Sequence, residues 1–186
     1  MFARTPRLTL RPGWAEDARP LATAIAHESV VTRLAHVPWP YHPEDAARFL
    51  AMERASGEVA CLIFAHEGGE QPRLVGGIGL HADADGDGHQ LGYWLTPDVW
   101  GRGYATEAGQ AMLGIARYAV GLDRLHALHH VDNPASGRVL RKLGFQPTGR
   151  VERRECRARG RHVQCAGYTL DLAAGDDDRP VMRMAA

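Results

Sequence analysis

The sequence predicts a mixed α/β domain, and three observations support this prediction. Segments with strand and helix patterns follow one another in the order β-α-α-β-β-β-α-β-α-β-β, which is not the regular alternation of a doubly wound parallel sheet. The 186 residues suit one domain of ordinary size, and 45% of them are hydrophobic, which is enough to build a core. No internal repeat is present.

The N-terminal part is expected to form one strand and two helices. Residues 7–11 alternate polar and apolar side chains, as a half-buried strand does. A helical stripe of apolar residues covers 14–27. After the proline-rich connector 38–43, a second helix is expected with Pro43 at its first position.

The middle of the chain is expected to form three strands in a meander. Residues 59–65 and 73–80 are rich in strand-forming side chains, and 89–96 follows as a third strand. The glycine-containing segments 67–70 and 83–88 predict the two turns between them.

The C-terminal part begins with a long helix. Apolar residues at helical spacing predict this helix over 103–120, followed by a strand at 124–131 and a short helix at 134–143. Residues 148–172 predict a pair of strands that turn near Gly160.

Composition excludes several classes of protein. The 22 basic and 22 acidic side chains leave no net charge, which argues against a dedicated nucleic-acid binder. The longest apolar run, 59–65, is far too short to span a membrane, and the N-terminus lacks the apolar core of a secretion signal. Three cysteines (Cys61, Cys156 and Cys165) form no CxxC pair and cannot all pair with one another. We therefore expect reduced thiols and a cytoplasmic protein that binds neither nucleic acid nor membrane.

Two short motifs imitate ligand sites. Residues 77–82 match the dinucleotide pattern G-x-G-x-x-A, but the acidic turn 83–88 follows where a helix must begin to face a pyrophosphate. The same turn resembles a calcium loop, yet Trp94 stands at the twelfth position, where a glutamate is needed. We expect an ordinary strand and a solvated turn.

Two clusters of side chains have both a functional and an ordinary interpretation. Histidines within 126–130, with Asp132 nearby, allow a metal site, but surface or substrate-facing histidines are favoured, and no metal is expected. Arginines within 150–161 allow nucleic-acid binding, but Glu152 and Glu155 interrupt them. A charged face of the terminal hairpin is favoured.

The strongest chemical signal is the junction between the third strand of the meander and the long helix. Gly101 and Gly103 allow a ligand to approach the backbone closely, and a helix begins immediately after them. The first amides of a helix have no internal acceptor, and the helix dipole places partial positive charge there. With Arg102 adding a cation, this junction can bind a phosphate group.

Two sequence blocks resemble the GNAT superfamily of N-acetyltransferases. Leu91-Gly92-Tyr93-Trp94-Leu95 followed by Trp100-Gly101-Arg102-Gly103-Tyr104-Ala105-Thr106-Glu107 resembles its acyl-CoA-binding motif, with Trp100 where glutamine or arginine is commoner. Asn133-Pro134-Ala135-Ser136 and Leu140-Arg141-Lys142-Leu143-Gly144-Phe145 resemble its N-x-x-S…K-x-G-F segment. The first block is most similar to the subgroup that acetylates the N-termini of ribosomal proteins.

The resemblance implies a GNAT fold, in which a central twisted, mostly antiparallel sheet of about seven strands is flanked by about four helices. Residues 5–173 would form the acetyltransferase domain, and 174–186 a short polar tail. Acetyl-CoA would be the co-substrate. The oligomeric state stays open between a monomer and a homodimer.

The resemblance also implies roles for individual residues. Backbone groups of Leu95 and Thr96 would pair with the pantetheine arm, and Asn133 would hydrogen-bond the cofactor near its reactive end. Ser136 would protonate the departing thiolate, although it can instead be a first-turn residue that bonds to the backbone. The pyrophosphate would be held by the segment Gly101, Arg102, Gly103, Tyr104, Ala105 and Thr106.

The general base and the acceptor stay open. His81, Glu107, His130 or a water chain could take the proton, and Glu107 could instead support the phosphate loop. The connector 39–41 could contact the acceptor, but ordinary packing is favoured. A protein N-terminal α-amino group is the leading acceptor. The alternatives are a small-molecule amine, such as a polyamine or an amine antibiotic, and a non-catalytic acyl-CoA-binding module.

Overall fold

A computed structural model describes residues 1–66, 71–83 and 88–173 of the chain. The predicted turn at 67–70, most of the acidic turn at 83–88 and the tail 174–186 lie outside the described residues. None of the helices in these ranges is both long and apolar enough to cross a membrane.

The described residues form one eight-stranded sheet in the order β1-β2-β3-β4-β5-β6-β8-β7. Every neighbouring pair is antiparallel except β5 and β6, which are parallel. The strands are β1 (Ala3–Arg4), β2 (Leu8–Arg11), β3 (Val59–Ala65), β4 (Arg73–Ala82), β5 (His89–Leu95), β6 (Arg124–His130), β7 (Gln146–Cys156) and β8 (Arg161–Asp171).

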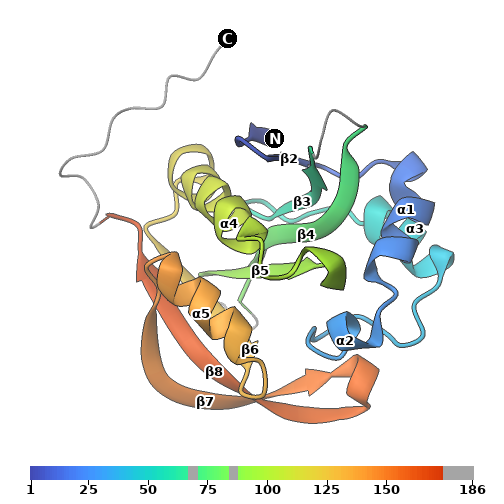
Figure 1. Cartoon of the computed structure of the whole chain (residues 1–186). Coiled ribbons are helices and arrows are strands. Elements are labelled where there is room, and N and C mark those ends of the chain that lie inside the picture. The colour runs from blue at the N-terminus through green and yellow to red at the C-terminus, as the bar shows by residue number, and fades with distance from the viewer. Residues whose placement is uncertain (67–70, 84–87, 174–186) are drawn as a thin grey trace.

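Helices cover both faces of the sheet (Figure 1). On one face, α4 and α5 bury apolar side chains such as Met112 and Leu140 against the larger core. On the other face, α1 and α3 pack Leu21 and Ala46 against Phe64. The α-helices are α1 (Ala18–Ile25), α2 (Glu28–Val31), α3 (Pro43–Ala51), α4 (Tyr104–Gly114) and α5 (Pro134–Lys142). Short helical turns are η1 (Ala15–Asp17), η2 (Pro97–Val99) and η4 (Arg157–Arg159), and η3 (Ile115–Val120) continues α4 as a π-helix.

The predicted mixed α/β fold with a mostly antiparallel sheet is confirmed. The described residues contain eight strands where about seven were expected, because the two-residue β1 carries no alternating pattern of its own. The sequence analysis also missed α2, whose four residues are too few to show helical periodicity. Pro43 begins α3 as predicted, and the terminal strand pair turns at Gly160, which has a left-handed backbone.

The run 77–82 that imitates a dinucleotide loop lies inside β4. A Cβ on Gly77 would lie 2.6 Å from the indole Nε1 of Trp94, and a Cβ on Gly79 would lie 2.5 Å from the Val59 carbonyl. These glycines therefore make room for a neighbouring side chain and a neighbouring strand, and the expected ordinary strand is observed.

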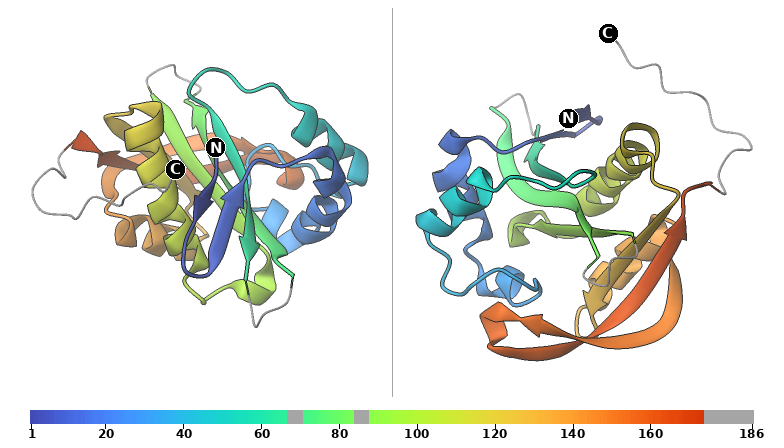
Figure 2. Two further views of the ribbon diagram at one scale, coloured as in Figure 1. Left: turned by 90° about the horizontal axis from the view of Figure 1, so that it is seen from above. Right: turned by 180° about the vertical axis from the view of Figure 1, so that it is seen from behind.

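The strands β5 and β6 are paired only at their beginnings. His89 pairs with Leu125 and Gln90 with His126, and no further pair joins the two strands in the described part of the sheet. Beyond these residues the strands diverge, so that the sheet opens between them (Figure 2). This gap lies beside the N-terminal ends of α4 and α5, where the predicted site residues are located.

Candidate active site

The predicted phosphate loop has the backbone that its glycines allow. Gly101 and Gly103 have φ angles of 81° and 82°, a left-handed region that side chains with a Cβ rarely adopt. Gly103 caps α4, and its carbonyl accepts hydrogen bonds from the Thr106 and Glu107 amides at 3.1 and 3.0 Å. Nothing lies within 4 Å of the Cβ position at Gly101. An anion can therefore approach the loop and the N-terminal end of the helix dipole.

Trp100, the residue that departs from the usual motif, ties this loop to the end of β5. Its indole Nε1 donates a hydrogen bond of 2.9 Å to the Leu95 carbonyl. The guanidinium of Arg33 lies 5.1 Å from the centre of its ring, a cation–π distance. Trp100 thus contacts both the strand end and the segment that follows α2.

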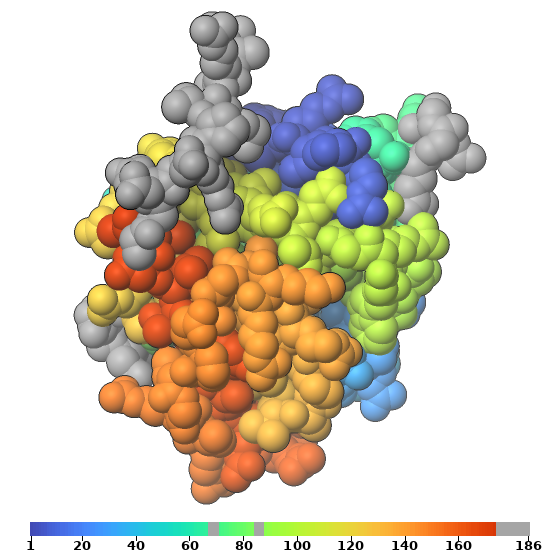
Figure 3. Space-filling model, turned by 60° about the vertical axis from the view of Figure 1, so that its left-hand side comes forward, coloured from blue at the N-terminus to red at the C-terminus, as the bar shows by residue number. Residues whose placement is uncertain are grey.

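Glu107 braces the phosphate loop against the N-terminal segment. On the surface, atoms of the N-terminal residues (blue) lie against those of the part of the chain that contains α4 (yellow-green; Figure 3). Its carboxylate accepts hydrogen bonds from the Thr5 hydroxyl at 2.6 Å and from the backbone amide and Nε of Arg7 at 3.0 and 2.7 Å. Arg7 in turn donates from Nη1 to the Arg102 carbonyl at 2.9 Å. Burial acts to raise the pKa of Glu107, but the bonds from Thr5 and Arg7 hold it below its ordinary value. These contacts support the loop-bracing role and not that of a base.

The backbone groups that face the gap belong to Tyr93 and Leu95. The Thr96 amide donates to the Val75 carbonyl at 2.8 Å, across the opposite edge toward β4. Because backbone groups alternate in direction along a strand, those of Leu95 and Tyr93 point toward β6. The gap therefore offers the backbone groups of Tyr93 and the amide of Leu95 for pairing with an extended ligand, whereas the Leu95 carbonyl is bonded to Trp100 and the Thr96 amide is used within the sheet.

Ser136 forms a hydrogen-bonded pair with Tyr93, a residue to which the sequence analysis assigned no role. The Ser136 Oγ lies 2.7 Å from the Tyr93 hydroxyl, which also donates to the Ser136 carbonyl at 3.1 Å. Burial raises the pKa of Tyr93 to about 12, although the bond with Ser136 acts in the opposite direction, so the phenol keeps its proton. A tyrosine next to the motif glycine was visible in the sequence, but its partner is 43 residues away.

A cavity of about 1000 Å³ connects these groups across the gap in the sheet. It is large enough for a substrate of considerable size. Arg102 and Thr96 do not line it, and Asn133, at the start of α5, does. The predicted site residues that line it are Leu95, Gly101, Gly103, Tyr104, Ala105, Thr106, Asn133 and Ser136.

The other predicted candidates divide between the cavity and the rest of the molecule. His81 and His130 line the cavity, and Glu107 does not. From the connector, Tyr41 lines it and also packs against α1 and α2, whereas Trp39 does not reach it. Across the described ranges, no group of three or more histidine, cysteine or carboxylate side chains gathers as a metal site would require.

Comparison with known families identifies the domain. The family model described as "Acetyltransferase (GNAT) domain" matches residues 7–146. The chain belongs to the GNAT acetyltransferase family. Among curated GNAT relatives, the "Uncharacterized N-acetyltransferase YoaA" of Bacillus subtilis (strain 168) is 39% identical over 77 residues, which cover 41% of this chain and 44% of YoaA. The "Uncharacterized N-acetyltransferase p20" of Bacillus licheniformis is 26% identical over 167 residues, 89% of this chain and 93% of p20.

Solved GNAT structures share the fold. RimL, a ribosomal L7/L12 alpha-N-protein acetyltransferase solved with coenzyme A, superposes with a TM-score of 0.74 at 18% identity, over 94% of this chain and 99% of RimL. The spermidine N-acetyltransferase of Vibrio cholerae, solved with CoA and spermine, gives a TM-score of 0.73 at 16% identity, over 91% of this chain and 98% of that chain. At these identities the likeness concerns the fold alone.

Proposed function

We propose that this GNAT domain transfers the acetyl group of acetyl-CoA to a primary amine, and that a protein N-terminal α-amino group is the preferred acceptor. The observation that best supports this proposal is the gap between β5 and β6. The gap lies beside the phosphate loop and opens into a cavity on both sides of the sheet. A phosphate group at the loop and an extended arm along Tyr93 and Leu95 would bring a thioester toward Ser136.

The residues of the site fit the chemistry of acetyl transfer. The amine nitrogen forms a bond to the thioester carbonyl carbon, the carbon–sulfur bond breaks, the nitrogen loses a proton and the sulfur gains one. Backbone amides at the free edge of β5 polarise the carbonyl. Ser136 donates a proton to the sulfur, and Tyr93, whose hydroxyl is in contact with Ser136, holds that side chain in place and can resupply the proton.

The charges of the cavity support an α-amino group over a polyamine. A polyamine carries several positive charges, and among the lining residues in the described ranges the basic side chains outnumber the acidic ones. An α-amino group has a pKa of about 8, against about 10.4 for an alkyl amine, so a larger share is neutral at physiological pH. Among the lining residues in the described ranges, the basic ones are Arg33, Arg54, Arg138, Lys142, Arg153 and Arg154, and the acidic ones are Glu58, Asp83 and Glu155.

The first experiment is calorimetric titration with acetyl-CoA, with desulfo-CoA and adenosine 3′,5′-bisphosphate as controls. We expect acetyl-CoA and desulfo-CoA to bind in the micromolar range, and the bisphosphate, which lacks the pyrophosphate arm, to bind much more weakly. Absence of binding at millimolar acetyl-CoA would contradict the proposal.

Thiol release then identifies the acceptor. The panel contains a peptide with a free N-terminus, the same peptide with a blocked N-terminus, and spermidine. We expect release only with the free peptide. If thiol is released with spermidine and not with the free peptide, the acceptor is a polyamine and not a protein N-terminus.

Variants test the proton donor. Ser136→Ala and Tyr93→Phe should each lower kcat by about 100-fold with acetyl-CoA affinity retained, and the double variant should be little worse, since the two hydroxyls act as one unit. Tyr118→Phe is the matched control, because Tyr118 is 77% exposed. Full turnover in Ser136→Ala would remove this residue from the mechanism.

A further inference from the structure

Arg33, which follows α2 in the chain, places a cation in the cavity. Its side chain is exposed and lines the cavity. The guanidinium lies 5.1 Å from the centre of the Trp100 ring, and within the described part of the chain it forms neither a hydrogen bond nor an ion pair. Its N–H groups are therefore available to a ligand that enters the cavity.

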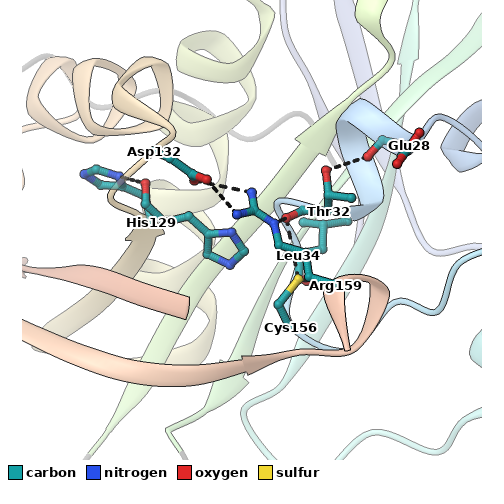
Figure 4. Close-up of polar contacts among 8 residues, drawn as sticks. Glu28, Thr32, Leu34, His129, Asp132, Cys156 and Arg159 are labelled. Carbon is teal, nitrogen blue, oxygen red and sulfur yellow. Dashed lines mark hydrogen bonds and ion pairs between the residues drawn. The ribbon is translucent and has the colours of Figure 1, made fainter. Parts of the chain in front are cut away.

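The β7–β8 hairpin fixes the backbone on both sides of Arg33. Arg159, at the tip of this hairpin, donates from Nε to the Thr32 carbonyl at 2.7 Å and from Nη1 to Asp132 at 2.6 Å (Figure 4). The Arg157 amide donates to the Ala35 carbonyl at 2.9 Å. A fixed backbone keeps the side chain near one place, which lowers the entropic cost of binding a ligand there.

That place is the open end of the gap between β5 and β6. Trp100, which the guanidinium covers, follows β5 and is bonded to the Leu95 carbonyl. Asp132, to which Arg159 ties the segment after α2, follows β6. Arg33 therefore lies between the ends of the two strands that diverge.

The amine of the acceptor must approach from the face of the sheet that α2 covers. Apolar residues of α2 pack with Trp94, whereas Tyr93, the preceding residue of β5, contacts Ser136. Because side chains alternate along a strand, α2 and Ser136 lie on opposite faces of the sheet. Since Ser136 protonates the sulfur from one face in the proposed reaction, the amine reaches the carbonyl carbon from the other, past Arg33.

Two other arginines that line the cavity already have partners. Arg154 donates to the Glu152 carboxylate from Nε at 3.0 Å and from Nη2 at 2.6 Å. Arg54 donates to the Phe49 carbonyl at 3.0 Å, and its guanidinium lies over the ring of the same phenylalanine. Arg33 differs from both in that its donors are not used within the described residues.

The carboxylate of Asp132 is also engaged. It accepts hydrogen bonds from Nη1 and Nη2 of Arg159 at 2.6 and 3.3 Å, one at each oxygen. The bond from Arg159 is the main cause that holds the pKa of Asp132 below its ordinary value, and the charge of Arg33 acts in the same direction. Two guanidinium groups thus share one carboxylate, so these three side chains together carry a net positive charge.

We propose that Arg33 binds a carboxylate of the acceptor, and that the acceptor is a peptide with acidic side chains shortly after its N-terminal α-amino group. The inference rests on the proposed function. A guanidinium binds a carboxylate through two parallel hydrogen bonds, and the Trp100 ring supports the guanidinium from one side. An extended chain advances about 3.3 Å per residue, so side chains beyond the first residue can reach Arg33 while the amine is at the thioester.

The charge preference is tested with three peptides that differ only in their second, third and fourth residues, which are aspartate, asparagine or lysine. We expect kcat/KM to be about 5-fold higher or more for the aspartate peptide than for the asparagine peptide, and lowest for the lysine peptide. Salt at about 1 M should remove most of this difference. Equal values for the aspartate and asparagine peptides would overturn the proposal, and equal turnover of free aspartate would overturn the peptide as acceptor.

Charge reversal tests Arg33 itself. Arg33→Gln should abolish the preference, and Arg33→Glu should invert it, so that the lysine peptide becomes the best of the three. Arg19→Glu is the matched control, because it makes the same change at an exposed residue of α1 outside the cavity, and it should keep the preference for aspartate. Preference for aspartate in Arg33→Glu would remove Arg33 from the proposal.

Calorimetry separates a carboxylate of the acceptor from a phosphate of CoA. Arg33→Gln should bind acetyl-CoA as tightly as the unmodified protein does. With both proteins saturated with desulfo-CoA, it should bind the aspartate peptide about 5-fold more weakly. Weaker binding of acetyl-CoA with unchanged binding of the peptide would overturn the proposal, since Arg33 would then serve the cofactor.

The same measurements keep this inference apart from the proposed function. Equal turnover of all three peptides would overturn the carboxylate site and leave acetyl transfer to a peptide N-terminus in place. Arg33-dependent binding of the aspartate peptide, without turnover of any amine, would support the carboxylate site and overturn the proposed function.

Discussion

Replacing Glu107 by alanine tests whether the N-terminal segment braces the phosphate loop. The side chain is 14% exposed and accepts hydrogen bonds from Thr5 and from the amide and guanidinium of Arg7. A hydrogen bond to a charged group contributes about 1.5–3 kcal/mol, but Arg7 is 48% exposed, which places its ion pair at the low end of that scale. We expect Glu107→Ala to lower the free energy of unfolding by about 2–4 kcal/mol.

The loss should be visible as a fall in Tm of about 2–4 °C for each kcal/mol in a chain of this size. It should also raise the KM for acetyl-CoA several-fold, because Arg7 would no longer be held where it donates to the Arg102 carbonyl. At saturating acetyl-CoA, kcat should change little. Arg73→Ala is the control, since the Arg73–Asp98 pair is about half exposed on both sides and should contribute less than about 1 kcal/mol.

The pH dependence of this effect has a defined sign. Since the folded pKa of Glu107 lies below its ordinary value of 4.5, the carboxylate stabilises the protein fully above that value. The stabilisation disappears as the pH falls through the folded pKa. The Tm difference between the unmodified protein and Glu107→Ala should therefore shrink in acid. An equal Tm and an equal KM for the two proteins at pH 7 would refute the bracing role.

Three further substitutions have expected outcomes. Gly103→Ala forces a Cβ into a left-handed backbone and should cost about 1–2 kcal/mol in a thermal melt, with weaker binding of acetyl-CoA in calorimetry. Trp100→Phe removes the indole donor to the Leu95 carbonyl and should raise the KM for acetyl-CoA more than it lowers kcat. Asp17→Ala removes a buried carboxylate and leaves the Arg11 guanidinium, whose side chain is 16% exposed, without its two-point partner; urea unfolding should show a loss of about 3–5 kcal/mol with an unchanged KM. The Asp17 pKa is lowered mainly by the bond from Arg11, so this difference should also diminish as the pH falls below about 4.

The parts of the site that local sequence determines were predictable. Two glycines before an amphipathic helix specify a loop that exposes helix amides, and the structure gives Gly101 and Gly103 the left-handed backbone that such a loop requires. Pro43 marks the first turn of α3 for an equally local reason, its fixed φ and missing amide.

The parts that depend on distant contacts could not be predicted. Thr5 and Arg7 contact Glu107 across about 100 residues, and Arg159 contacts Thr32 across 127. No periodicity within a segment encodes such a contact, because it arises only when the sheet assembles. The divergence of β5 and β6 could not be predicted for the same reason, because the sequence of each strand, taken separately, has the pattern of an ordinary strand.

Only two residue pairs join β5 to β6 in the described residues, so the stability of the sheet depends on whether a ligand occupies the gap between these strands. One half of the sheet, β1 to β5, and the other, β6 to β8, share only the pairs at His89 and Gln90 along their common boundary in the described residues. A pantetheine arm carries amides of its own, so on the proposed function it would take the place of a missing strand and fasten the two halves together. Mass action then adds about 2.7 kcal/mol of folding stability at a ligand concentration one hundred times Kd. The concentration of acetyl-CoA would thereby affect the folding stability of the protein as well as its rate of turnover.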